Sequence, residues 1–128
     1  MTYPNSTVEV VICIGSNCGD KYQNVHKGIK WINSIFSTLH ASTIYATPDC
    51  KGGPRKYMNA VAIGNTDIEL QQLEIMCKNF EKEMGRDKKA REAGDVPLDI
   101  DIVVYNGKIV RETDYKREFF KIGFDQLR

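Results

Sequence analysis

The stretch VPLDIDIVVYNG holds the residues best suited to chemistry. Asp99 and Asp101 stand one residue apart in an otherwise apolar segment. Side chains alternate between the two faces of a strand, so both carboxylates point the same way, roughly 6.5–7 Å apart. Leu98, Ile100 and Ile102 then face the opposite, core side. Two carboxylates this close repel each other unless a cation joins them, and Mg²⁺ accepts one or two carboxylates together with substrate phosphates.

The D-x-D spacing alone also fits a strand with one solvated, polar face. Aspartate disfavours strands, however. Val103 and Val104 break the alternation, which indicates burial on both faces further along. A basic segment also precedes the strand. Such a segment is often plain surface, but next to paired carboxylates it predicts phosphate binding. Its basic residues are Arg86, Lys88, Lys89 and Arg91.

Periodicity predicts the elements that must position these aspartates. An amphipathic helix is expected after a turn, with Asp20 as its N-cap. Thr66 or Asp67 is expected to cap the next helix, and Gly85 fits its C-terminal end. The segment 86–97 is expected to be irregular, and the end of the chain shows no clear period. The predicted elements are strands over 8–15, 41–48, 57–65 and 98–105, helices over 21–39 and 66–84, and a hairpin turn at Asn106–Gly107.

This order is typical of an α+β ferredoxin-like sandwich. Its antiparallel sheet has helices packed on one face. The other face would be covered by loops or would form a site.

Composition limits the classes of function. The chain has 128 residues, 41% hydrophobic and 27% charged, which predicts one folded domain over 1–128. A net charge of +1 argues against binding to nucleic acid or to a membrane. The four cysteines form no C-x-x-C pair, so a zinc site is not expected, and Cys13 and Cys77 are expected to be buried thiols. With no signal peptide and no long apolar run, we expect a monomeric, cytoplasmic protein.

Five short motifs occur in order over roughly the first 110 residues. They are I-G-S-N at 14–17, Y-A-T-P at 45–48, Y-M-N-A-V at 57–61, E-x-x-x-G-R at 81–86 and L-D-I-D-I at 98–102. Together they resemble the hydroxymethyldihydropterin pyrophosphokinases of folate biosynthesis, of which this chain would be a short, divergent member.

The resemblance implies an ATP-dependent enzyme that transfers pyrophosphate from ATP to the hydroxymethyl group of 6-hydroxymethyl-7,8-dihydropterin and releases AMP. ATP is the co-substrate, and Asp99 and Asp101 would hold two Mg²⁺ ions. Arg86 and Lys89 would join these aspartates as catalytic residues.

The same resemblance implies two sets of binding residues. The residues expected at the pterin are Thr47, Tyr57, Asn59 and Phe119. Those expected at the nucleotide are Glu81, Arg86 and Arg117. Phe120 and Phe124 are rival assignments for Phe119, and core packing is the alternative for the whole aromatic group.

The chain also departs from the family pattern. Ala93, Asp95 and Val96 stand where the family has tryptophan, proline and a phosphate-clamping arginine. Arg91 or Lys88 could replace that arginine. The chain also stops some tens of residues before typical members do. The alternative function is therefore a catalytically impaired relative that binds pterin or nucleotide. A small-molecule sensor or an RNA-binding module would leave the D-x-D pair without a purpose.

Overall fold

The computed structural model describes residues 6–128. In this part of the chain, six strands and five helices confirm the predicted α+β ferredoxin-like class. The strands are β1 (Val8–Ser16), β2 (Thr38–Ala41), β3 (Tyr45–Thr47), β4 (Tyr57–Thr66), β5 (Asp99–Tyr105) and β6 (Lys108–Ile109). The helices are α1 (Lys21–Ile35), α2 (Leu70–Glu83), α3 (Lys88–Ala93), α4 (Glu112–Tyr115) and α5 (Glu118–Leu127).

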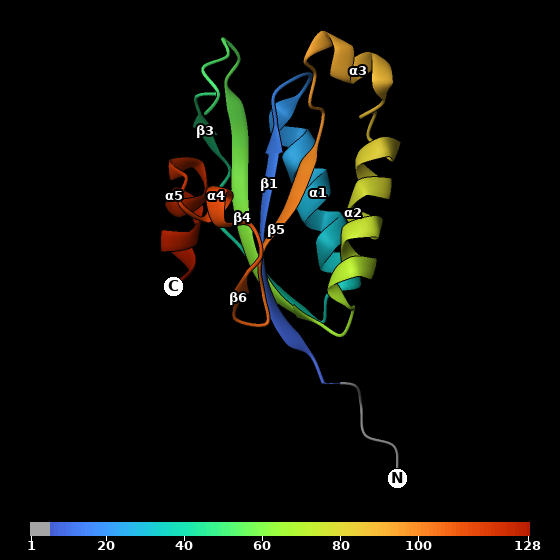
Figure 1. Cartoon of the computed structure of the whole chain (residues 1–128), viewed down its shortest axis with the longest axis vertical. Helices are drawn as coiled ribbons and strands as arrows, with labels where there is room; N and C mark the ends of the chain where they lie inside the picture. The colour runs from blue at the N-terminus through green and yellow to red at the C-terminus, as the bar shows by residue number, and fades with distance from the viewer. Residues whose placement is uncertain (1–5) are drawn as a thin grey trace.

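The sheet is antiparallel, with β1 at its centre (Figure 1). Its strand order is β2-β4-β1-β5-β6, and the short β3 also pairs with β4. The predicted hairpin at Asn106–Gly107 is confirmed, since β6 pairs back onto β5 and both turn residues have positive φ.

A bulge explains the two valines that break the alternation of β5. Ile12 pairs with Ile102, whereas Val11 pairs with Val104, so Val103 is the extra residue. A bulge of this kind places two successive side chains on the same face. Val103 and Val104 accordingly belong to the same apolar cluster.

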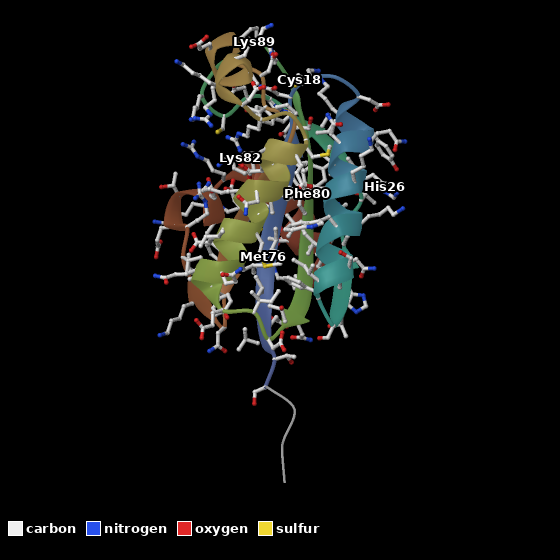
Figure 2. The ribbon with its side chains drawn as sticks, turned by 90° about the vertical axis from the view of Figure 1, so that its right-hand side faces the viewer. Cys18, His26, Met76, Phe80, Lys82 and Lys89 are labelled. Carbon is white, nitrogen blue, oxygen red and sulfur yellow. The ribbon has the colours of Figure 1, made fainter. Side chains whose placement is uncertain are left out.

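The main core lies between the sheet and the helices α1 and α2, which cover one face side by side (Figures 1 and 2). Leu98, Ile100 and Ile102 point into it, as predicted for the apolar side of the D-x-D strand. Phe80 on α2 stacks on Trp31 of α1 with the ring centres 4.6 Å apart. This stacking joins the two helices over the sheet.

The opposite face carries a second apolar cluster, beneath α5. The buried members are Val11, Cys13, Val61, Val103 and Phe120. Loops or a site were expected to cover this face. The helices α4 and α5 take that place instead over part of it, as Figure 1 shows on the side away from α1 and α2. The predicted buried thiols Cys13 and Cys77 are confirmed, one on each face.

Two predicted boundaries near the first helix were wrong. The helix ends at Ile35 because Phe36 turns to extended backbone, and residues 38–41 pair with β4 as β2. The expected strand over 41–48 is therefore divided between β2 and the separate strand β3. Pairing with β4 outweighed the helical spacing that continues to Leu39. The predicted N-cap Asp20 is confirmed, since its carboxylate accepts from the Gln23 amide.

Two further predictions about elements were wrong, and two C-terminal helices had not been predicted. The N-cap position of α2 is Glu69, whose side chain makes no capping hydrogen bond, and the Thr66 hydroxyl accepts from the Ile68 amide before the helix begins. The supposedly irregular segment contains α3, whose N-cap is Asp87. The C-terminal residues, which showed no period, form α4 and α5. No helix in residues 6–128 is both long and apolar enough to cross a membrane.

Candidate active site

A cavity of about 280 Å³ opens on the face that α5 only partly covers. It lies where β1 ends and where β4 and β5 begin. Both aspartates of the D-x-D pair line it, so the prediction that they share a face is confirmed. The cavity thus gathers residues from segments far apart in the sequence.

Strand register places three motifs in one row. Gly15 lies opposite Asn59 on β4 and opposite Asp99 on β5. A Cβ atom at Gly15 would stand 2.7 Å from the Asn59 Oδ1 atom, which is closer than real contacts allow. The glycine therefore lets β1 pass beneath the Asn59 side chain. Two residue pairs along, Cys13 lies opposite Asp101.

The aspartate pair is shielded from solvent, with side-chain exposures of 33% for Asp99 and 19% for Asp101. Burial, together with the charge of Asp99, raises the pKa of Asp101 to about 8. Burial also acts to raise the pKa of Asp99, but a hydrogen bond with Asp101 and the charge of Arg86 outweigh it and lower that pKa. The pair therefore retains one proton near neutral pH.

Arg86 is held between two carboxylates. Its Nη1 atom lies 2.7 Å from Asp99 Oδ1 and 2.9 Å from Glu81 Oε1. Glu81 is buried, and its other oxygen accepts from the Ile100 amide at 2.8 Å. Burial raises the pKa of Glu81. Glu81 therefore connects the end of α2 to β5 and orients the guanidinium against Asp99.

A second guanidinium faces the other aspartate. Arg111 Nη2 lies 3.8 Å from Asp101 Oδ1, and its Nε atom donates to the Asp114 carboxylate. Arg111 and Asp114 both line the cavity, and neither was singled out from the sequence. The available signal was the Asn-Gly turn, because a tight hairpin brings the residues after β6 back alongside β5.

The four residues predicted at the pterin all line the cavity. They are Thr47, Tyr57, Asn59 and Phe119. Asn59 is buried, and its amide donates to the Thr47 hydroxyl. This part of the cavity combines polar groups with an aromatic ring.

Tyr45 fixes the start of α5 beside the cavity. Its hydroxyl donates to the Phe119 carbonyl and accepts from the Gly123 amide at 3.1 Å. Burial raises the pKa of this hydroxyl, which keeps it a donor. Of the rival aromatics, Phe120 is fully buried and Phe124 stacks on it, whereas Phe119 lines the cavity.

Asn17, the last residue of the I-G-S-N motif, is a connecting residue to which the sequence analysis assigned no role of its own. Its carboxamide oxygen accepts from the Val96 amide at 2.7 Å, and its nitrogen donates to the Gly94 carbonyl at 3.1 Å. The same nitrogen reaches the Tyr57 hydroxyl at 3.4 Å. Asn17 thereby holds the segment before β5 against the I-G-S-N turn.

Three predicted residues lie outside the cavity lining. Lys89 is exposed on α3, at the end of the molecule that Figure 2 shows uppermost. Arg117 is exposed at the N-cap of α5. Glu81 lies behind Arg86. Lys88 and Arg91, considered as replacements for the missing arginine, are also exposed on α3.

Two loops at the rim are connected through Arg55. Its guanidinium donates to the Asp95 carboxylate and to the Ala93 carbonyl, the latter at 3.1 Å. The loop between β3 and β4 is thus tied to the segment between α3 and β5. Two of the divergent positions, Ala93 and Asp95, take part in this contact.

Comparison with known proteins identifies the family. Residues 11–127 match the 7,8-dihydro-6-hydroxymethylpterin-pyrophosphokinase (HPPK) family. The chain belongs to this family. It is 33% identical over 119 residues to the mitochondrial folate synthesis bifunctional protein of Pisum sativum, a match that covers 86% of this chain. It is 29% identical over 106 residues to a 2-amino-4-hydroxy-6-hydroxymethyldihydropteridine pyrophosphokinase of Aquifex aeolicus, covering 80% of this chain.

The matched relatives differ greatly in length. The chain spans 23% of the pea bifunctional protein and 64% of the Aquifex protein. A pyrophosphokinase of Porphyromonas gingivalis is 27% identical over 101 residues, which cover 76% of this chain and 69% of that protein.

The donor set of this HPPK-family cavity fits magnesium that is completed by substrate. Within residues 6–128, no three His, Cys, Asp or Glu side chains gather into a metal site made by protein alone. Mg²⁺ binds through one or two carboxylates plus substrate phosphates and water. Asp99 and Asp101 both line the cavity and supply such a pair of oxygen ligands, and a bound cation would displace the proton that they share.

Proposed function

We propose that this chain transfers the pyrophosphoryl group of ATP to the hydroxymethyl group of 6-hydroxymethyl-7,8-dihydropterin and releases AMP. Membership of the HPPK family supports this reaction. The observation that carries it is a single cavity lined both by the D-x-D carboxylates and by the four residues predicted for pterin. One cavity can then hold the acceptor hydroxyl next to the phosphates, as direct transfer requires.

The pterin half of the cavity suits a flat, polar ring. Asn59 uses one amide hydrogen on Thr47, and its remaining polar atoms are available to the edge of a heterocycle. Phe119 offers a ring face for stacking. The hydroxymethyl group would then point toward the aspartates.

The phosphate half of the cavity suits a charged transition state. Asp99 and Asp101 would hold the two Mg²⁺ ions, whose positive charge would offset the negative charge that develops on the phosphates during transfer. Arg86, already oriented by Glu81, would stabilise the phosphate oxygens. Lys89 and Arg117 are exposed outside the cavity lining, so they would contact parts of the nucleotide that extend beyond the cavity.

A product assay tests the proposal. The protein is mixed with Mg-ATP and 6-hydroxymethyl-7,8-dihydropterin, and AMP is followed by chromatography. AMP release that depends on the pterin and disappears in Asp101→Ala is the expected result. AMP release that survives Asp101→Ala would contradict the proposed role of the aspartates.

The alternative is a relative that binds pterin without transferring phosphate. The observation that favours it is Val96, an uncharged residue lining the cavity at the position of the family's phosphate-clamping arginine. No AMP release together with tight pterin binding by calorimetry would establish this alternative. A single-domain, monomeric, cytoplasmic protein that binds neither nucleic acid nor membrane stays a prediction, and gel filtration tests its oligomeric part.

A further inference from the structure

The cavity has three cationic side chains in its lining, and they differ in how tightly they are held. They are Lys51, Arg86 and Arg111. Lys51 is exposed on the loop between β3 and β4. Arg86 is fixed by Asp99, by Glu81 and, at 3.5 Å, by the Leu98 carbonyl. Arg111 lies between these extremes.

Arg111 is anchored at one atom and open at the others. Its backbone is placed by bonds from the Val110 and Arg111 amides to the Val103 carbonyl, at 2.8 and 3.4 Å. Its Nε atom donates to Asp114, whose side chain is 18% exposed. Within residues 6–128, neither terminal nitrogen of Arg111 donates a hydrogen bond. Nη2 has only the looser 3.8 Å approach to Asp101.

This arrangement matches what phosphate recognition requires of an arginine. The guanidinium offers donors in a rigid, planar fork that fits phosphate oxygens. A carboxylate that holds Nε sets the plane of the fork and leaves its far edge free. The side chain of Arg111 is 48% exposed, so a ligand in the cavity can reach it.

Asp101 is not expected to remain the partner of Arg111 once substrate is bound. If Asp101 binds a metal ion, its oxygens are no longer available to a guanidinium. The terminal nitrogens of Arg111 then need new acceptors within the same cavity, and the phosphates of the nucleotide supply them. Val96, at another point of the lining, brings no charge.

We propose that Arg111 binds the phosphates of Mg-ATP, and that Asp114 is a positioning residue that orients its guanidinium. The proposal rests on the proposed function. It assigns to this chain a phosphate-binding cation from the segment between β6 and α4, in addition to Arg86.

The test measures binding rather than turnover. The probe is the Mg²⁺ complex of α,β-methylene-ATP, whose bridging carbon prevents transfer, and affinity is measured by calorimetry. Arg111→Gln is expected to weaken probe binding about ten- to a hundredfold, as for a lost hydrogen bond to a charged group. Pterin affinity and the melting temperature should stay unchanged, and Arg111→Lys should restore part of the affinity.

The opposite result separates a counter-ion from a ligand-binding residue. If Arg111 only neutralises Asp101, its removal frees the carboxylate, and Arg111→Gln would bind Mg²⁺ and the probe more tightly. Unchanged or increased affinity overturns the proposal. Arg128→Gln is the matched control, since Arg128 is also paired with an aspartate three positions away but does not line the cavity.

A double-mutant cycle tests the role of Asp114. Asp114→Asn should raise the KM for ATP several-fold in the natural chain and have no further effect in an Arg111→Gln background. An equal effect in both backgrounds would show that Asp114 does not act through Arg111. If the natural chain itself fails to bind the probe, the proposed function fails together with this inference. If the natural chain binds the probe and Arg111→Gln binds it equally well, the proposed role of Arg111 fails while the proposed function stands.

Discussion

At the scale of single residues, the site depends on two carboxylates that the fold forces together. Asp99 and Asp101 share one face of β5, and each has a guanidinium beside it. The two carboxylates are neutralised to different extents. A guanidinium nitrogen of Arg86 lies 2.7 Å from Asp99, whereas that of Arg111 lies 3.8 Å from Asp101. Asp101 is the less compensated of the two and therefore the one that keeps the proton.

This asymmetry predicts how stability depends on pH when a chelator keeps the protein free of metal. The pKa of Asp101 is about 8 in the folded chain, against about 3.9 when unfolded. Its contribution to stability is complete below pH 4 and is lost as the pH rises toward 8. The unfolding free energy should therefore fall over this range, by at most about 1.4 kcal/mol per pH unit for one proton.

Urea unfolding at a series of pH values checks this dependence. In Asp101→Asn the slope between pH 5 and 8 should largely disappear, because the residue no longer titrates. A slope that is the same in both proteins would assign the proton to another group.

Phe119 and Phe124 offer a second test at the residue scale, because they are neighbours with different surroundings. Both rings pack against the apolar cluster on this face, but only Phe119 also lines the cavity. Phe119→Ala should weaken pterin binding by about 1–3 kcal/mol, the range measured for stacking of bases on aromatic side chains. Phe124→Ala should lower stability and leave pterin affinity nearly unchanged. Fluorescence titration and thermal unfolding separate the two effects, and greater loss of affinity in Phe124→Ala would reverse the assignment.

The sequence predicted single residues well where a local period places them. Alternation along one strand was enough to put Asp99 and Asp101 on the same face, opposite Ile100. It could not find Arg111, whose relation to Asp101 depends on the return of a hairpin. It also could not place Lys89, because the position of α3 depends on contacts between loops.

At the scale of elements, the long periodic segments were predicted and the short ones were missed. The strands β1, β4 and β5 and the helices α1 and α2 all have apolar patterns long enough to identify. The missed elements β2, α3, α4 and α5 have four to ten residues, and their formation depends on neighbours: β2 on the edge of β4, and α5 on the cluster of Phe120. Tertiary contacts, rather than local propensity, determine them.

The segment between α3 and β5 is held by two contacts of unequal strength, which gives an element-scale prediction. Asn17 is 7% exposed and bonds both Gly94 and Val96, whereas the Arg55 pair with Asp95 is open to solvent. Asn17→Ala should destabilise the chain by about 1–3 kcal/mol, because the partly buried Val96 amide loses its acceptor. Arg55→Ala should leave the melting temperature nearly unchanged.

Hydrogen exchange measures how each substitution affects the segment between α3 and β5. Arg55→Ala should increase exchange only near residues 93–97, whereas Asn17→Ala should also lower the unfolding free energy in urea. If Arg55→Ala proves the more destabilising of the two, the loop depends on its surface contact instead.

At the scale of the whole molecule, the sheet is covered on both faces but unequally. The helices α1 and α2 cover one face fully, and α5 covers only part of the other (Figure 1). The cavity opens in the uncovered part. Tyr45 connects these regions, since it bonds Phe119 at the rim and Gly123 within the covered part. The packing of α5 therefore sets the wall of the site.

Removal of the central contact of α5 tests this dependence. Phe120 has no exposed surface, so Phe120→Ala should cost about 3–5 kcal/mol of stability. Ile122→Ala is the matched control on the same helix, because Ile122 is 36% exposed and should cost well under 1 kcal/mol. Urea unfolding measures both. At temperatures where Phe120→Ala remains folded, pterin affinity should fall more than affinity for Mg-ATP, because α5 carries Phe119 but neither aspartate. Equal losses of both affinities would mean that α5 supports the whole sheet rather than one wall of the cavity.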